Sequence, residues 1–166
     1  MFVYVEEKDL GTLFSVIYKH YTKRETVPDY FVEKEGMKRL IGVMVGVKMD
    51  NFYPDIFSKS TYLLTQINKG HFFSNGNKRM ALVLTLVFAF INSYWILARS
   101  KDEYKKELEM IFPNLPSFED YQDFSPEEFG YYNLSIIIAD SNKYDLTFED
   151  LKEKTMAFLK FSLIRI

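Results

Sequence analysis

The chain has 166 residues, of which 48% are hydrophobic and 27% are charged. This length and composition fit one globular domain spanning residues 1–166, and they exclude a disordered chain. The 21 Lys and Arg residues against 23 Asp and Glu residues give no positive excess for nonspecific nucleic-acid binding, and the absence of Cys excludes disulfides and thiolate metal sites.

Apolar residues recur at helical spacing along most of the chain. They predict helices over residues 6–22, 32–48, 55–69, 76–93 and 101–110, and the capping residues Ser125 and Thr147 predict two more. Residues 2–5 have the composition of a short strand, and residues 51–54 predict a turn or a small hairpin. The sequence therefore predicts an all-α domain with at most a small β-hairpin.

Residues 80–98 carry no charge and approach the length that spans a bilayer. Asn92 and Ser93 interrupt the stretch, and a helix that is apolar all round is also typical of the buried centre of a soluble domain. The N-terminus has acidic residues where a signal peptide carries positive charge. We therefore expect no membrane segment and a cytoplasmic location.

Residues 71–79, with the sequence HFFSNGNKR, differ from the rest of the chain because they gather polar and basic side chains directly before the most apolar helix. The start of a helix leaves N–H groups unpaired and binds anions, phosphate above all. Gly76 allows close approach of a ligand, while Lys78 and Arg79 add charge and donors. Histidine is the side chain that most often acts as a general base, so His71 is a candidate to accept a proton from an attacking hydroxyl.

These residues allow a second interpretation. A Ser-Asn-Gly-Asn stretch before Lys-Arg is also an ordinary helix N-terminus with a solvated tip. The residue types alone therefore leave two hypotheses, a phosphate-binding loop with a base beside it and a purely structural turn.

The same segment resembles the motif of the Fic/Doc family, in which His-x-Phe-x-acid-Gly-Asn precedes a basic pair. Lys78-Arg79 is similar to the Doc (death-on-curing) branch, where the basic pair is Lys-Arg. Upstream segments resemble Doc-type sequences at similar offsets, whereas residues 98–122 look like an insertion. The matching positions are His71, Phe73, Gly76, Asn77, Lys78 and Arg79, with Glu35-Gly36, Tyr53-Pro54-Asp55 and Phe57-x-Lys59 upstream.

The resemblance implies a helical bundle around the central helix and a transferase activity. Fic proteins move a nucleotide monophosphate from ATP or a related donor to a protein hydroxyl, with Mg²⁺. The Doc branch phosphorylates elongation factor Tu and is the toxin of a toxin–antitoxin pair. The expected partners are therefore a protein substrate, such as elongation factor Tu, and an antitoxin, with ATP as the donor.

Residue roles follow from the resemblance. His71 is implied as the general base and Phe73 as the anchor of the loop. Gly76, Asn77 and Lys78 are implied to hold phosphates, and Arg79 to neutralise charge as the bond breaks. The stretch Asn51, Phe52 and Tyr53 is implied to dock the target peptide.

Asn75 departs from the motif, because the family has an acid there that binds Mg²⁺. An amide oxygen is neutral, and Mg²⁺ favours carboxylates, so we expect weaker metal binding at Asn75 and lower activity. The alternative is a catalytically degenerate Fic fold that binds a nucleotide or a protein partner. Phe31 stands where an inhibitory Fic helix has Ser or Thr, which favours restraint by a separate antitoxin.

Overall fold

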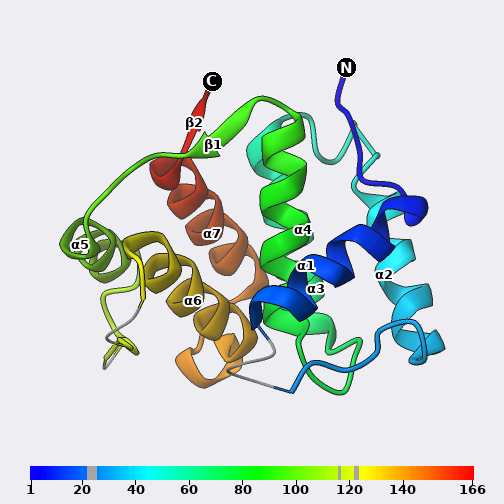
Figure 1. Cartoon of the computed structure of the whole chain (residues 1–166). Helices are drawn as coiled ribbons and strands as arrows, with labels where there is room; N and C mark the ends of the chain where they lie inside the picture. The colour runs from blue at the N-terminus through cyan, green and yellow to red at the C-terminus, as the bar shows by residue number, and fades with distance from the viewer. Residues whose placement is uncertain (22–25, 116, 122–123) are drawn as a thin grey trace.

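The computed structural model describes residues 1–21, 26–115, 117–121 and 124–166 (Figure 1). Within these residues it has seven α-helices, two 3₁₀-helices and a two-stranded sheet, which confirms the prediction of an all-α fold with little β-structure. The elements are η1 (Glu7–Asp9), α1 (Leu10–Tyr21), α2 (Lys34–Gly46), α3 (Ile56–Gly70), α4 (Asn77–Ile91), β1 (Tyr94–Ile96), α5 (Lys101–Ile111), α6 (Pro126–Ala139), η2 (Ser141–Tyr144), α7 (Phe148–Ser162) and β2 (Leu163–Arg165).

Helix α4 stands at the centre of the bundle and packs against α1, α3, α6 and β1 (Figure 1). Its most deeply buried residues include Met80, Leu84 and Phe88, each at most 1% exposed. The cover is incomplete, since Leu82 and Leu86 are half-buried and Phe90 is 50% exposed. The helix is thus central, as its composition predicts, but one flank remains partly open. No helix among the described residues is long and apolar enough to cross a membrane.

The strands are not where the sequence places them. Residues 2–5 form no strand, because the backbone N–H and C=O of Val3 bond instead to the side chain of Asn92, both at 2.8 Å. Residues 51–54 form a turn without a hairpin. The sheet joins β1 and β2 in antiparallel pairing, with Trp95 opposite Ile164. The two strands lie far apart in sequence, so local patterning gives little sign of their pairing.

Helix starts are predicted well, because their capping residues act locally. Asp55, Ser125 and Thr147 each accept a backbone N–H of the first turn. Asp150 accepts the backbone N–H of Thr147 and so completes a capping box, as its position predicts.

The segment expected as an insertion contains helix α5, which packs against α6 and α7. Tyr104 and Leu108 on α5 are fully buried. Its described part therefore contributes to the same hydrophobic core as the rest of the bundle.

Lys59 on α3 is a buried charge that fixes the turn before that helix. The side chain is 0% exposed, and its Nζ donates to the carbonyl of Val47 at 2.8 Å and lies 2.7 Å from Asp50. The hydrogen bond from Lys59 lowers the pKa of Asp50. The pair therefore contributes stability at neutral pH that is lost as the pH falls through the pKa of Asp50.

Replacing Lys59→Met should lower the free energy of unfolding by about 1–3 kcal/mol, because the carbonyl of Val47 loses its buried partner. Urea unfolding at neutral pH measures the change. Lys38→Met is the control, since that side chain is 73% exposed and should change stability by less than about 0.5 kcal/mol. Equal effects of the two substitutions would contradict a structural role for Lys59.

Candidate functional site

The loop of residues 71–76 joins α3 to α4 and carries the motif. His71 ends α3 in the left-handed conformation, with φ of 45°, and its side chain is exposed. Such a φ is uncommon outside glycine, and histidine is among the residues enriched there. The chain turns sharply at His71, which leaves an accessible imidazole at the end of a rigid helix.

Phe73 and Asn77 fix the inner side of this loop. Phe73 is 4% exposed and packs edge-on against the ring of Tyr30, with centroids 4.8 Å apart. The amide of Asn77 accepts from the N–H of Phe73 at 2.9 Å and donates to its carbonyl at 2.8 Å. The Asn77 side chain therefore holds the loop in shape, while its own backbone begins α4.

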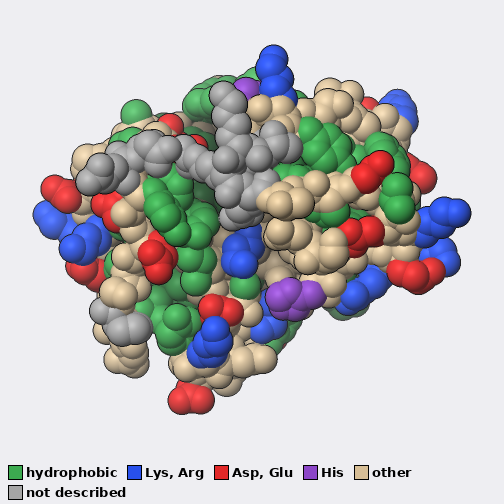
Figure 2. Space-filling model, turned by 60° about the horizontal axis from the view of Figure 1, so that its bottom comes forward, with side chains coloured by type: hydrophobic (Ala, Val, Ile, Leu, Met, Phe, Trp, Pro, Cys, Tyr) green, Lys and Arg blue, Asp and Glu red, His purple; other side chains and the backbone are tan. Residues whose placement is uncertain are grey.

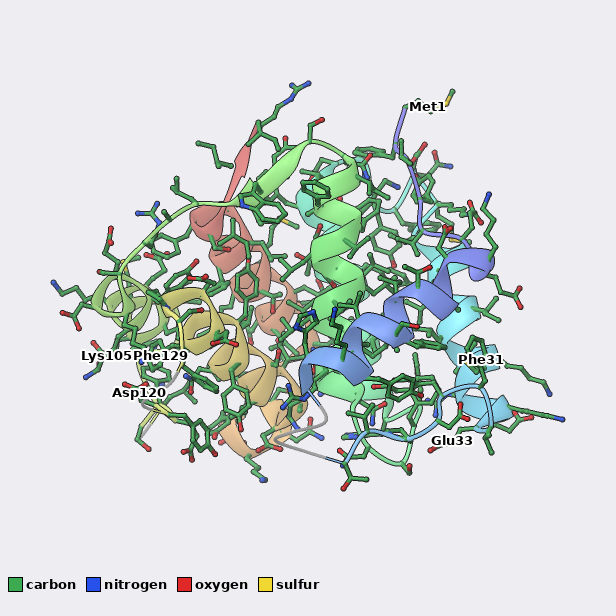
Figure 3. The ribbon with its side chains drawn as sticks, in the orientation of Figure 1. Met1, Phe31, Glu33, Lys105, Asp120 and Phe129 are labelled. Carbon is green, nitrogen blue, oxygen red and sulfur yellow. The ribbon has the colours of Figure 1, made fainter. Side chains whose placement is uncertain are left out.

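The outer side of the loop is bound to residues 26–33, which we call the support segment. Ser74 donates its N–H and its hydroxyl to the carboxylate of Glu33, at 2.8 and 2.5 Å. Asn75 donates to the carbonyl of Thr26 at 2.8 Å, and the carbonyl of Gly76 accepts from the Tyr30 hydroxyl at 3.2 Å. Three consecutive loop residues are thus bound to one segment, which leads into α2 at Glu33 (Figure 3).

The support segment is itself anchored on α1. The Tyr18 hydroxyl donates to the carbonyl of Pro28 at 2.6 Å and accepts the N–H of Tyr30 at 3.1 Å. Burial raises the pKa of Tyr18, so its hydroxyl stays protonated and able to donate at neutral pH. The sequence gives no signal for this role, because Tyr18 and Tyr30 both look like ordinary core aromatics.

Gly76 is the residue before α4, and its φ is 73°. A side chain there would be strained and would overlap the Tyr30 hydroxyl. Gly76 is the N-cap residue of α4, and no side chain caps the first N–H groups of the helix from this position. The positive end of the helix dipole therefore faces the loop.

A cavity of about 440 Å³ opens beside the loop. Its size is within the range of small-molecule sites. The structure brings His71 together there with the predicted phosphate-binding residues, and it adds residues that the sequence did not single out from α3 and α6. The lining residues are Asn68, His71, Ser74, Asn75, Gly76, Asn77, Lys78, Arg79, Tyr132, Ile136, Ala139 and Asp140.

The cavity has a basic side and one acidic residue. Lys78 is exposed and Arg79 is half-buried on the first turn of α4. Asp140 follows α6, and its carboxylate lies 3.2 Å from Nζ of Lys143. Figure 2 shows Lys and Arg side chains beside a histidine on the face of the molecule that lies at the bottom of Figure 1. The arrangement suits a ligand with several negative charges.

The residues present do not fit a magnesium ion held at position 75. The only metal-binding atom of Asn75 is its neutral Oδ1, which already accepts the N–H of Gly76 at 2.8 Å. Among the described residues there is no group of three or more His, Asp or Glu side chains that could hold a metal.

The structure does not bring the expected docking residues to this cavity. Asn51, Phe52 and Tyr53 precede α3, whereas His71 follows it. The 15 residues of that helix separate them by about 22 Å along its axis. Phe52 is 71% exposed, and Tyr53 packs against Tyr62. Their docking role stays a prediction without support from their position.

Fold and site together define a helical protein with a basic loop beside a cavity at the start of its central helix. A family model described as Fic/DOC family matches residues 13–89, a range that begins within α1, ends within α4 and includes the whole loop. This match supports the Fic/DOC family for the chain. Searches of curated proteins and of solved structures gave no match. Tyr132 and Asp140, which complete the cavity, lie beyond the matched range.

Gly36 lets α2 approach the loop, and its replacement tests how tightly the two are packed. A Cβ atom there would overlap the carbonyl oxygen of Phe72 and lie 2.7 Å from the ring of Phe73. We expect Gly36→Ala to lower the free energy of unfolding by about 1–3 kcal/mol, measured by urea unfolding.

Gly42→Ala is the matched control on the same helix. A Cβ atom at Gly42 would meet no atom within 4 Å, so helix propensity alone should raise stability by up to about 1 kcal/mol. A stabilising effect at both positions would contradict the close packing of α2 on the loop.

Proposed function

We propose that the protein is a Fic/Doc-type transferase that moves a phosphate or a nucleotide monophosphate from a nucleoside triphosphate to a protein hydroxyl. The observation that carries the proposal is the exposed imidazole of His71 on the same cavity as Lys78, Arg79 and the N-terminus of α4. A base and an anion-binding surface on one cavity are what phosphoryl transfer needs.

The chemistry follows from these positions. The oxygen of the target hydroxyl attacks phosphorus while His71 accepts its proton. The bond from phosphorus to the leaving phosphate oxygen breaks, and Lys78 and Arg79 stabilise the charge that develops. Transfer of a nucleotide monophosphate from ATP releases pyrophosphate, and transfer of the terminal phosphate releases ADP.

A second groove supports a nucleotide as the donor. It has a volume of about 250 Å³, lies along the open flank of α4 and shares Lys78, Arg79 and Tyr132 with the first cavity. Its walls are mostly apolar, including Leu82 and Leu86. A nucleoside triphosphate has charged phosphates and a planar base, and these two kinds of surface match the two adjoining spaces.

The Lys78-Arg79 pair extends the proposal to the Doc-like role. In that role ATP is the donor, elongation factor Tu is the protein substrate and the protein is a toxin restrained by an antitoxin. Asn75 favours the second candidate, a degenerate Fic fold that binds a nucleotide or a protein without transfer, because the expected carboxylate is missing.

Label transfer from ATP to proteins of a cell lysate tests these functions. Parallel samples carry α- or γ-labelled ATP, with Mg²⁺ or with EDTA. Label from the γ position indicates a kinase, and label from the α position indicates an AMP transferase. We expect His71→Ala to reduce the transfer at least about a hundredfold, because the base is lost.

His20→Ala is the matched control, since His20 is the other histidine of the chain, is exposed and does not line the cavity. Its transfer should equal that of the native protein. ATP binding without transfer of either label would contradict the transferase and support the binding module.

A further inference from the structure

Asn75 uses both ends of its amide inside the protein. Its Nδ2 donates to the carbonyl of Thr26 and its Oδ1 accepts the N–H of Gly76, each at 2.8 Å. Only a side chain that both donates and accepts can make this pair of bonds. An ionised carboxylate would accept from Gly76 but would set a charged oxygen against the carbonyl oxygen of Thr26.

The bond to Thr26 is the middle one of three. Ser74 on one side is bound to Glu33, and Gly76 on the other side is bound to Tyr30. The bonds reach both ends and the middle of the support segment, so the conformation of the loop depends on this segment. Asn75 is therefore part of the frame that shapes the loop.

The positive charge around the cavity comes from groups of the protein and needs no bound cation. Lys78 and Arg79 lie on the first turn of α4, whose N-terminus adds partial positive charge. Asp140 is the one carboxylate among the described residues that line the 440 Å³ cavity, and Nζ of Lys143 lies 3.2 Å from it. Glu127 and Glu128 line the adjoining groove, where Glu128 accepts the N–H of Ser125 at 2.9 Å. Lys78, Arg79 and the helix N-terminus can neutralise phosphate charge, whereas the described residues offer a divalent cation no group of three or more His, Asp or Glu ligands.

We propose that Asn75 is not a metal ligand but a clasp of the motif loop, by which we mean that its two amide hydrogen bonds hold the loop in its conformation. We also propose that this site binds phosphates without a divalent cation. The inference rests on the proposed binding of a nucleoside triphosphate, and it changes what holds that ligand. Metal-free ATP carries more negative charge than its magnesium complex and suits a site whose countercharge comes from Lys, Arg and a helix N-terminus.

Calorimetric titration with ATP, in Mg²⁺ and in EDTA, tests the binding. The native protein should bind ATP at least as tightly in EDTA as in Mg²⁺. Asn75→Asp should weaken binding in EDTA by about fivefold or more relative to the native protein, because the new carboxylate repels the phosphates. The same variant should bind ATP more tightly in Mg²⁺ than in EDTA. Asn114→Asp, which adds the same charge at an exposed position that does not line the cavity, should behave as the native protein.

Each other outcome has a clear meaning. Binding by the native protein that is at least tenfold tighter in Mg²⁺ overturns the inference and leaves the proposed function standing. If Asp140→Asn then bound ATP equally well in Mg²⁺ and in EDTA, the cation would be placed at Asp140. Absence of ATP binding in both buffers overturns the inference together with the proposed function.

Urea unfolding tests the clasp without any ligand. The midpoint of Asn75→Asp should lie at a lower urea concentration than that of Asn114→Asp, since only the first variant loses the bond to Thr26. The difference should shrink at about pH 4, where the introduced carboxyl is partly protonated and can donate again. Equal midpoints of the two variants at neutral pH would overturn the clasp.

Discussion

The site depends on the hydrogen bonds that tie residues 74–76 to residues 26–33. Each loop residue has its own partner on the support segment, and the three partners are of different kinds: a carboxylate, a backbone carbonyl and a tyrosine hydroxyl. Such a set specifies one arrangement, because any shift of the loop would leave several polar groups unpaired at once. The support segment in turn is held on α1 by Tyr18.

These hydrogen bonds fix the position of the first turn of α4 relative to the cavity. The buried side of α4 fixes the direction of the helix, and the tied loop fixes where its N-terminus opens. Lys78 and Arg79 then project from a rigid element toward the cavity that His71 also lines. Preorganised charge of this kind is effective in phosphoryl transfer, since it needs no rearrangement when charge develops.

The sequence predicted those parts of the molecule that depend on local chemistry. Helix starts at Ser125 and Thr147 follow from their caps, and the position of the motif before α4 follows from its residue types. The pairing of β1 with β2 and the contact of Glu33 with Ser74 join distant segments, and one sequence gives no sign of either. The same holds for the cavity wall that α6 supplies.

The motif positions therefore divide into two groups that residue type alone does not separate. Asn75 and Asn77 are polar and lie beside the basic pair, so the sequence suggests that both meet the ligand. In the structure their amides bond to Thr26, Gly76 and Phe73. The charged residues of the first turn and His71 line the cavity as well. An amide at position 75 is then a requirement of this frame, because a carboxylate there would break the bond to Thr26.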